Sequence, residues 1–269
     1  PYHDFVFGAE GLNPVSEGNN VLFFLDAGII RSRSLEILLL LSGVSILMAF
    51  GIGKNFVVFV AFLLTEALQN VNGLILNGGD NLLKFNLLYM SFCNSFVFLS
   101  LGAAKRRRGA DRENTLYNFL TNLGCFSIIL HLLLVYFISA ISKIHSDVWY
   151  NGIAIYYIMH LERFVGSSFN QVIGQNTYLV TLFSYGTILL ELFFPFLVFH
   201  KVLRFPVLFL GVLMHLSIFY LMMIHEFQLL FIAHYGFFFY DHEYRRFYQK
   251  LLRASSQLFK KINLKHSYQ

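Results

Sequence analysis

The amino-acid sequence predicts an all-α polytopic membrane protein, a bundle of about seven transmembrane helices with additional interfacial helices. Hydrophobic residues make up 57% of the 269-residue chain and charged residues only 13%, which is unlike the composition of a soluble domain. The mean hydropathy is +0.60, and the apolar residues gather in runs of roughly 20, the length that a helix needs to cross a bilayer. These observations exclude an ordinary soluble enzyme fold.

The first expected element is a polar, glycine-containing segment over residues 1–33, which we place outside the cytoplasm. One membrane domain over residues 34–240 follows, and residues 241–269 form a basic cytoplasmic tail. Asn77–Asn81 consists of turn-forming residues and interrupts the apolar pattern, so we expect an external turn there. The apolar runs predict spans at 35–52, 56–76, 82–104, 116–141, 178–199, 205–224 and 227–240. Residues 150–160 are too short to cross and predict an interfacial or re-entrant segment, before an outer loop at 162–176.

The net charge of +5 comes from basic clusters beside the apolar runs, at 105–108, at 200–204 and in the tail. Positive clusters next to spans are typical of cytoplasmic loops, so we expect the C-terminal tail in the cytoplasm. The tail interleaves its cations with aromatic and aliphatic residues and predicts a basic amphipathic helix on anionic lipid. Membrane lipids are therefore expected partners, and nucleic acid is not.

The stretch Val135–Tyr157 is the leading candidate for a functional site, because several polar residues stand where a membrane helix should be apolar. Lys143, partly withdrawn from water, could act as a base, and Asp147 four residues later could position it. Trp149 lies in the same stretch. The alternative is a lysine that only extends towards the membrane surface, beside interfacial aromatic residues.

Ionisable residues inside the predicted spans form a second group of candidates. Glu66, His131 and His215 fall near mid-membrane, and Glu191 falls closer to the cytoplasmic side. Such groups are costly in lipid unless paired, so we expect a buried polar cluster. This cluster could serve function, or it could be a hydrogen-bond network that holds helices together.

Other motifs carry less chemistry. Cys93 and Cys125 are the two cysteines, both within apolar runs, and predict small core residues rather than a disulfide or a redox motif. His225-Glu226 begins like a zinc-protease helix, but Leu229 stands where the second ligand is required. We therefore expect no metal.

A family resemblance joins these features. The run Tyr136–Ile144, followed by Asp147, Trp149, Gly152 and Tyr156, resembles the vitamin K-dependent carboxylase-like membrane family, also called the HTTM domain. Two further motifs are similar to motifs of that family. Asn77–Asp80 resembles its turn after an early span, and Met214-His215 followed by Phe227 resembles its late helix pair. The run Gly152–Tyr157 is similar to the stand-alone bacterial branch, which includes SdpB, a protein needed to mature a secreted peptide toxin.

The resemblance implies an additional helix before the position where this chain begins, and a bacterial cytoplasmic membrane. It implies that Lys143 is the base acting on a reduced quinone of the vitamin K type at the outer face. Asp147 and His215 join it as candidate catalytic residues, and Trp149, Glu66 and His131 are candidates for binding the cofactor. The carboxylase's large extramembrane domain has no counterpart after Tyr240, and no histidine stands near Asn72-Gly73. Carboxylation itself is therefore not implied.

Two functions follow from different classes of protein. The first is an enzyme that modifies or matures an exported peptide or protein with a quinone-type cofactor. The second is a non-catalytic membrane subunit whose helices serve as an assembly or docking surface for other membrane subunits. A transporter that relays protons through the buried Glu and His residues is a third, weaker reading.

Overall fold

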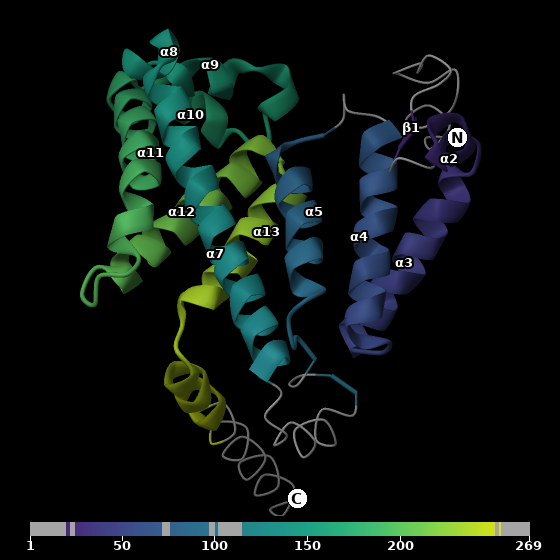
Figure 1. The fold of residues 1–269 in the computed structure, drawn as a ribbon. Helices are drawn as coiled ribbons and strands as arrows, with labels where there is room; N and C mark the ends of the chain where they lie inside the picture. The colour runs from purple at the N-terminus through teal and green to yellow at the C-terminus, as the bar shows by residue number, and fades with distance from the viewer. Residues whose placement is uncertain are drawn as a thin grey trace, which may run out of the picture.

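Helices make up almost all of the chain that the computed structural model describes (Figure 1). The described residues are 20–21, 25–71, 76–96, 100–101, 115–250 and 253. The sheet found within them is a minimal antiparallel pair, β1 (Asn20–Val21) with β2 (Leu25–Asp26). The predicted all-α class is therefore confirmed for this part of the chain.

The N-terminal helices form a small group with its own core. After the short α2 (Ala27–Ser32), α3 (Ser34–Phe50) and α4 (Lys54–Val71) pack as an antiparallel pair. Gly51 and Gly53 have φ angles of 68° and 79°, so the reversal between α3 and α4 uses a backbone region that favours glycine. The core that this pair shares with the next helix consists of Val44, Val57, Val58, Ala61, Leu87 and Phe96.

Helix α5 (Gly78–Met90) begins inside the stretch for which the sequence predicts a turn. The Asn77 side chain accepts a hydrogen bond from the Gly79 N–H at 2.7 Å, and Asp80 accepts one from the Asn77 N–H at 2.7 Å. These reciprocal bonds form a capping box, so the polar residues start the helix. A Cβ at position 79 would lie 2.8 Å from the Phe227 ring, so glycine also permits a close helix contact.

The same helix ends at Met90, well before the predicted end of the third span. Side chains of neighbouring helices form hydrogen bonds with backbone groups of the segment that follows. The Asn55 side chain donates to the Ser91 carbonyl oxygen at 2.8 Å, and the Thr121 hydroxyl accepts from the Asn94 N–H at 3.2 Å. Because these backbone groups find partners, the helix can stop within the bundle.

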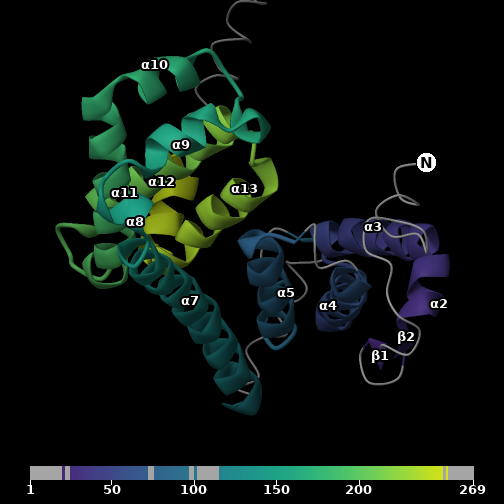
Figure 2. The same ribbon diagram turned by 90° about the horizontal axis from the view of Figure 1, so that it is seen from above.

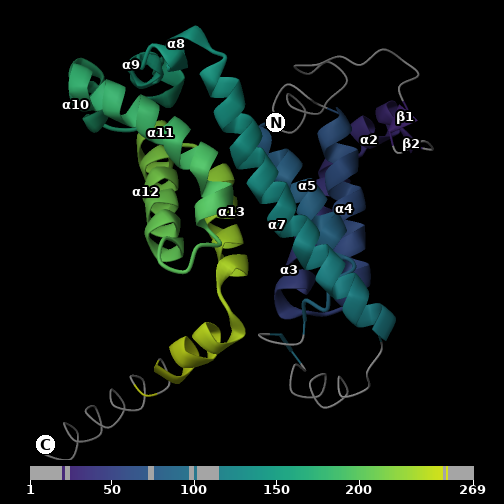
Figure 3. The ribbon, with the colours of Figure 1, turned by 60° about the vertical axis from the view of Figure 1, so that its left-hand side comes forward.

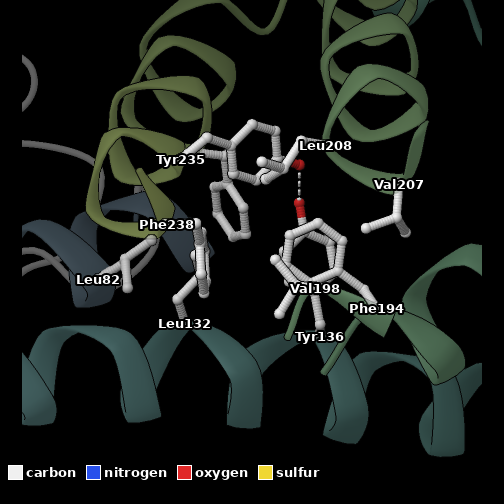
Figure 4. Close-up of a cluster of buried hydrophobic side chains, with 10 residues drawn as sticks. Leu82, Leu132, Tyr136, Phe194, Val198, Val207, Leu208, Tyr235 and Phe238 are labelled. Atoms are coloured by element: carbon white, nitrogen blue, oxygen red, sulfur yellow. Dashed lines mark hydrogen bonds between the residues drawn. The ribbon is translucent and has the colours of Figure 1, made fainter. Parts of the chain in front are cut away.

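The main bundle consists of α7 (Thr115–Ile144), α11 (Thr177–Leu197), α12 (Arg204–Met222) and α13 (His225–His234). The 3-10 turn η3 (Tyr235–Phe238) continues α13. The buried side chains of this core are Leu82, Leu132, Tyr136, Phe194, Val198, Val207, Leu208, Phe231, Tyr235 and Phe238 (Figure 4).

Short helices between α7 and α11 cover one end of the bundle, and we call residues 145–176 the cap (Figure 1). The cap contains α8 (Asp147–Tyr150), α9 (Ala154–His160), η2 (Glu162–Phe164) and α10 (Phe169–Gln175). A short helix, α9, thus lies within the segment 150–160 that the sequence predicts to be too short to cross. The region predicted as an outer loop is partly helical.

Asn170 fastens the cap to the end of α12. Its side chain is fully buried and donates to the carbonyl oxygens of Phe164 at 3.1 Å and Leu221 at 2.9 Å. Its side-chain oxygen accepts from the Ser167 N–H at 3.2 Å, and the Gly166 N–H donates to Leu221 at 3.0 Å. One amide therefore satisfies backbone groups of two separate segments, which fixes the cap in place.

Helix α5 connects the two groups of helices. It contacts α4 on one side and α7 and α13 on the other, and the view along the bundle shows it between them (Figure 2). Side chains of α5 accordingly enter both cores, since Leu87 belongs to the small core and Leu82 to the large one.

Four of the described helices, α4, α7, α11 and α12, are long and apolar enough to cross a membrane. Helix α3 is apolar but has 17 residues, while α5 has 13 and α13 has 10. At 1.5 Å per residue, the last two reach only about 20 Å and 15 Å, short of a hydrocarbon core of about 30 Å. The structure confirms a bundle of membrane-type helices, whereas seven full-length spans are not confirmed.

The two ends of the bundle differ in charge. The loop between α11 and α12, which carries Lys201, lies at the end opposite the cap, and so does the helical segment 241–250 (Figures 1 and 3). These two basic segments thus share one end, as the charge pattern predicts. Some predicted features lie outside the described residues, namely the cluster at 105–108, Asn72-Gly73, residues 1–19 and residues 254–269.

Candidate functional site

Lys143 lies in the last turn of α7 and makes an ion pair with Glu191 of α11. Its Nζ atom donates to both carboxylate oxygens, at 2.9 Å to Oε1 and 2.7 Å to Oε2. It also donates to the Ser139 hydroxyl at 2.6 Å, one turn earlier on the same helix. These three contacts use all the donors of an ammonium group.

Glu191 lies on the buried face of α11, where Val180, Ser184, Ile188 and Phe194 recur at helical spacing. The residue is only 8% exposed, and the Lys143 side chain is 18% exposed. A carboxylate this deeply buried requires a counter-charge, and Lys143 supplies it. The pair therefore holds two charges in a position that excludes most of the solvent.

The sequence predicts different depths in the membrane for these two residues, with Lys143 at the outer face and Glu191 towards the cytoplasm. Their direct contact shows that they lie at the same depth. Helix α7 crosses the bundle obliquely (Figure 3), so counting residues along the chain does not give a common depth for two helices. The sequence identifies Glu191 as a buried ionisable residue. Its partner becomes visible only in the structure.

Trp149 and Asp147, both predicted near Lys143, lie on α8. The Lys143 Nζ atom is 5.2 Å from the centroid of the Trp149 ring, a distance typical of a cation–π contact. Asp147 begins α8 after the turn at His145 and Ser146, so it no longer follows Lys143 in one continuous helix. The carboxylate that positions Lys143 is therefore Glu191, and the helical spacing predicted for Asp147 does not occur.

An open pocket lies beside the ion pair, where the cap meets α7 and α11. Its volume is about 470 Å³, and its walls include Ile144, Tyr150, Asn151, Tyr185 and Ile188. Ile144 follows Lys143 in the chain, and Ile188 lies one turn before Glu191 on α11. The two charged residues themselves are not among these five lining residues. The pocket is largely apolar and aromatic, with one amide among its walls.

The cap segment of this pocket is held by Tyr185, whose hydroxyl donates to the Tyr150 carbonyl oxygen at 2.8 Å. Gly152 has a φ of 70°, and a Cβ at this position would lie 2.9 Å from the Tyr185 ring. Glycine is thus required here both by the backbone conformation and by the tyrosine packed against it.

His215 lies in a separate hydrogen-bond network inside the main bundle. Its Nε2 atom is 2.5 Å from the Tyr136 hydroxyl, which is 2.5 Å from the Tyr235 hydroxyl (Figure 4). Its Nδ1 atom contacts the side-chain oxygen of Gln228. Because that oxygen is an acceptor, the hydrogen belongs on Nδ1, and Tyr136 donates to Nε2.

The network joins three helices and η3 and is at least 97% buried at each side chain. Gly211 makes room for it, because a Cβ there would lie 2.3 Å from the Tyr235 hydroxyl oxygen. Tyr136 lies two turns before Lys143 on α7, about 10 Å along the helix, so the network is next to the ion pair but distinct from it.

Glu66 and His131 have other partners. Glu66 is 2.9 Å from the Lys84 Nζ atom and accepts from the Asn70 side chain at 2.6 Å. His131 packs edge-on against the rings of Phe85 and Tyr89, with ring centroids 5.3 Å and 6.1 Å apart. The polar cluster that the sequence predicts is therefore divided into separate groups of contacts.

Several residues of these groups were not singled out by sequence reasoning. Gln228 and Tyr235 have no distinctive spacing, and aromatic residues are so frequent in this chain that a single tyrosine carries no signal. Tyr136 begins the run that resembles the family, but its bond to His215 is visible only in the structure. Asn170 and Tyr185 are likewise identified only by their contacts. Their roles depend on which helices become neighbours.

Comparison with known protein families relates the chain to one of them. A family model described as the HTTM domain matches residues 81–242, more than half of the chain. The matched segment extends from α5 beyond η3 and includes the ion pair, the cap and the His215 network. Searches of curated proteins and of solved structures found no match.

Proposed function

The chain belongs to the HTTM family, and we propose that it is a membrane enzyme in which Lys143 and Glu191 accept a proton from a lipid-soluble cofactor. The reaction modifies or matures an exported peptide or protein. The observation that carries the proposal is the ion pair beside an apolar pocket at the capped end.

The pair suits proton transfer. If the Lys143 ammonium gives one proton to the Glu191 carboxylate, the products are a neutral amine and a neutral acid, and no net charge is created. Burial favours such neutral forms, because a low-dielectric environment penalises charges. The amine can then take a proton from an acidic hydroxyl, with Ser139 and Glu191 holding it in position.

The pocket fits a cofactor of the quinone class. Its volume of about 470 Å³ lies within the range of small-molecule sites, roughly 300–1,000 Å³. The two isoleucines supply apolar walls, Tyr150 and Tyr185 supply aromatic surfaces, and the Asn151 amide can bind a ring oxygen. A bound reduced quinone would supply the acidic hydroxyl. Of the three residues expected to bind the cofactor, Trp149 lies near Lys143, whereas Glu66 and His131 contact residues of α5. The five residues that line the pocket include none of the three.

The proposal includes an orientation. The capped end faces outside and the basic end faces the cytoplasm of a bacterium, since cations concentrate at the end opposite the cap. The chain then makes seven passes, with α5 and α13 as shortened passes shielded by their neighbours. The stand-alone bacterial branch is the proposed place within the family.

The test is Lys143→Arg, with exported peptides measured by mass spectrometry in cells that carry each variant. Arginine keeps the positive charge that Glu191 requires but is not deprotonated in proteins, so the modified product should disappear while the protein accumulates normally. Lys201→Arg is the matched control, because this exposed lysine lies at the other end. Unchanged product in Lys143→Arg would exclude Lys143 as the base.

A non-catalytic membrane subunit is the second candidate. The hydrogen bonds of Lys143 favour it, because they leave no donor of the ammonium group for a cofactor. All three donors of the ammonium are engaged, and the pair joins α7 to α11 as a structural support. The double variant Lys143→Met with Glu191→Leu separates the two functions, since it removes both charges but keeps their volume. A subunit retains its function with this variant, whereas an enzyme loses its product.

A further inference from the structure

Cys93 and Cys125 are brought together although they are 32 residues apart in the chain. Cys93 lies in the segment after α5, and Cys125 lies on α7. Their Sγ atoms are 4.0 Å apart, and both thiols are free. The sequence gives no sign of this proximity, because the two residues form no short motif.

We propose that Cys93 and Cys125 form a reactive dithiol, a modification site that a small disulfide oxidises to an intramolecular cross-link between the segment after α5 and α7. The inference does not depend on the proposed function, because it concerns neither the ion pair nor the pocket. A disulfide requires an S–S distance of about 2.05 Å, so the sulfur atoms must approach by roughly 2 Å.

The surroundings keep the two sulfurs close. The Cys93 thiol is within 3.4 Å of the Tyr89 carbonyl oxygen and 3.7 Å of the Thr121 carbonyl oxygen. The Asn94 N–H, next in the chain, donates to the Thr121 hydroxyl at 3.2 Å. These contacts hold the segment after α5 against α7, so the thiols remain neighbours while the helices keep their packing.

Gly124 makes the approach possible. A Cβ at this position would lie 2.5 Å from the Cys93 Sγ atom and 2.8 Å from the Tyr89 carbonyl oxygen. The Cys93 sulfur therefore packs directly on the backbone of α7, next to Cys125. A larger residue at 124 must displace that sulfur.

The two cysteines have different accessibility, which assigns their order of reaction. Cys93 is 4% exposed, whereas Cys125 is partly exposed. The Cys125 thiolate attacks one sulfur of the small disulfide and releases one thiol. The Cys93 thiolate then attacks the Cys125 sulfur of the mixed disulfide and releases the second thiol. Two protein thiols are oxidised, and one small disulfide is reduced to two thiols.

The test uses dithiodipyridine, a small aromatic disulfide, on the full chain in detergent. Each step releases one thiopyridone, which is measured by absorbance, and intact mass shows whether a pyridyl group stays on the protein. The wild-type chain should release two equivalents and retain no pyridyl group. Retention of two groups, a cross-link between two chains, or no reaction would overturn the proposal.

The matched variants separate the two steps. Cys93→Ser should release one equivalent and keep the pyridyl group on Cys125, because no second thiol is available. Cys125→Ser should react about tenfold more slowly, since the remaining thiol is buried. The opposite ranking of the two variants would contradict the assigned order.

Gly124→Ala provides a variant with both thiols intact. Its Cβ displaces the Cys93 sulfur, so the second release should slow by about tenfold while the first is unchanged. A second release at the wild-type rate would show that the packing of the Cys93 sulfur on Gly124 does not control formation of the cross-link. Thermal unfolding adds an independent measurement, because the oxidised wild-type chain should melt at a higher temperature than the reduced chain.

Discussion

Two ion pairs, one near each end of the main bundle, differ in what their cations can do. Lys143 pairs with Glu191 beside the cap. Arg204 begins α12 at the opposite end, where it contacts Glu243 and donates to the Phe238 carbonyl oxygen at 3.3 Å. The Arg204 guanidinium also lies 4.5 Å from the ring centroid of each of two aromatic residues, Phe205 and Tyr240.

The difference lies in the chemistry of the side chains. A guanidinium is planar, keeps its proton and offers five donors in a fixed arrangement, so Arg204 can bind a carboxylate, a carbonyl and two rings at once. This suits permanent attachment of the segment 241–250 to α12. An ammonium concentrates its charge on one nitrogen and can give up a proton. Under the proposed function, the pair beside the cap is the one that exchanges a proton, and the pair at the other end only attaches the segment 241–250.

The largest expected effect comes from Lys143→Ala, which leaves the buried Glu191 without its counter-charge. Breaking a buried pair from one side costs about 3–5 kcal/mol, so the variant should unfold at a clearly lower temperature in detergent. The double variant with Met at 143 and Leu at 191 should recover most of this loss. If Lys143→Ala unfolds at the same temperature as the wild-type chain, Glu191 is not held as a buried anion.

A neutral contact at the same end should have a smaller effect. Asn170→Ala removes the amide that binds Phe164 and Leu221, so the Phe164 carbonyl oxygen loses this donor and the Leu221 oxygen keeps the Gly166 N–H. The expected loss is about 1–3 kcal/mol, measured by thermal unfolding, with faster hydrogen exchange in the cap. Gln171→Ala is the control, since Gln171 is exposed on the same helix. Equal effects of both variants would show that the buried amide contributes nothing specific.

Arg204→Lys tests the structural pair directly. Lysine keeps the charge but cannot reproduce the flat, forked contact, so amides of 241–250 should exchange about tenfold faster, as expected for the loss of one charge-assisted hydrogen bond. The exposed Arg246 provides the control substitution Arg246→Lys. Exchange at the wild-type rate in Arg204→Lys would mean that charge alone attaches this segment.

The smallest effect is a pH dependence at the same end. The hydrogen bond from the Tyr240 N–H and the positive charges of Arg204 and His242 lower the pKa of Glu243 below its usual 4.5. A carboxyl group whose pKa is lowered by folding stabilises the attachment above its usual pKa and ceases to do so as the pH falls through the lowered value. Attachment of 241–250, followed by protease accessibility, should thus persist from neutral pH to about pH 4.5 and weaken below it.

Glu243→Gln checks the origin of this dependence. The amide has no carboxyl group to protonate, so the acid-induced step should be absent and the segment should be more accessible already at neutral pH. An identical acid step in this variant would assign the pH dependence to another group.

The apolar runs determined the helices with good accuracy where each helix lies in a uniform environment. The predicted spans at 116–141, 178–199 and 205–224 agree closely with α7, α11 and α12. Agreement fails at α5, which begins within the predicted turn and ends early. Its boundaries depend on Asp80, which completes the capping box at the start of the helix, and on Thr121, which lies on α7.

The sequence by itself also identified Lys143, because a lysine at the end of an apolar run is conspicuous, and it identified Glu191 as a buried acid. Only the tertiary structure decided that they are partners, that His215 joins two tyrosines, and that Cys93 meets Cys125. The reason is physical. Local spacing predicts contacts only while a helix continues, and α7 ends at Ile144, before Asp147 can reach Lys143. Beyond that end, the packing of helices selects the neighbours.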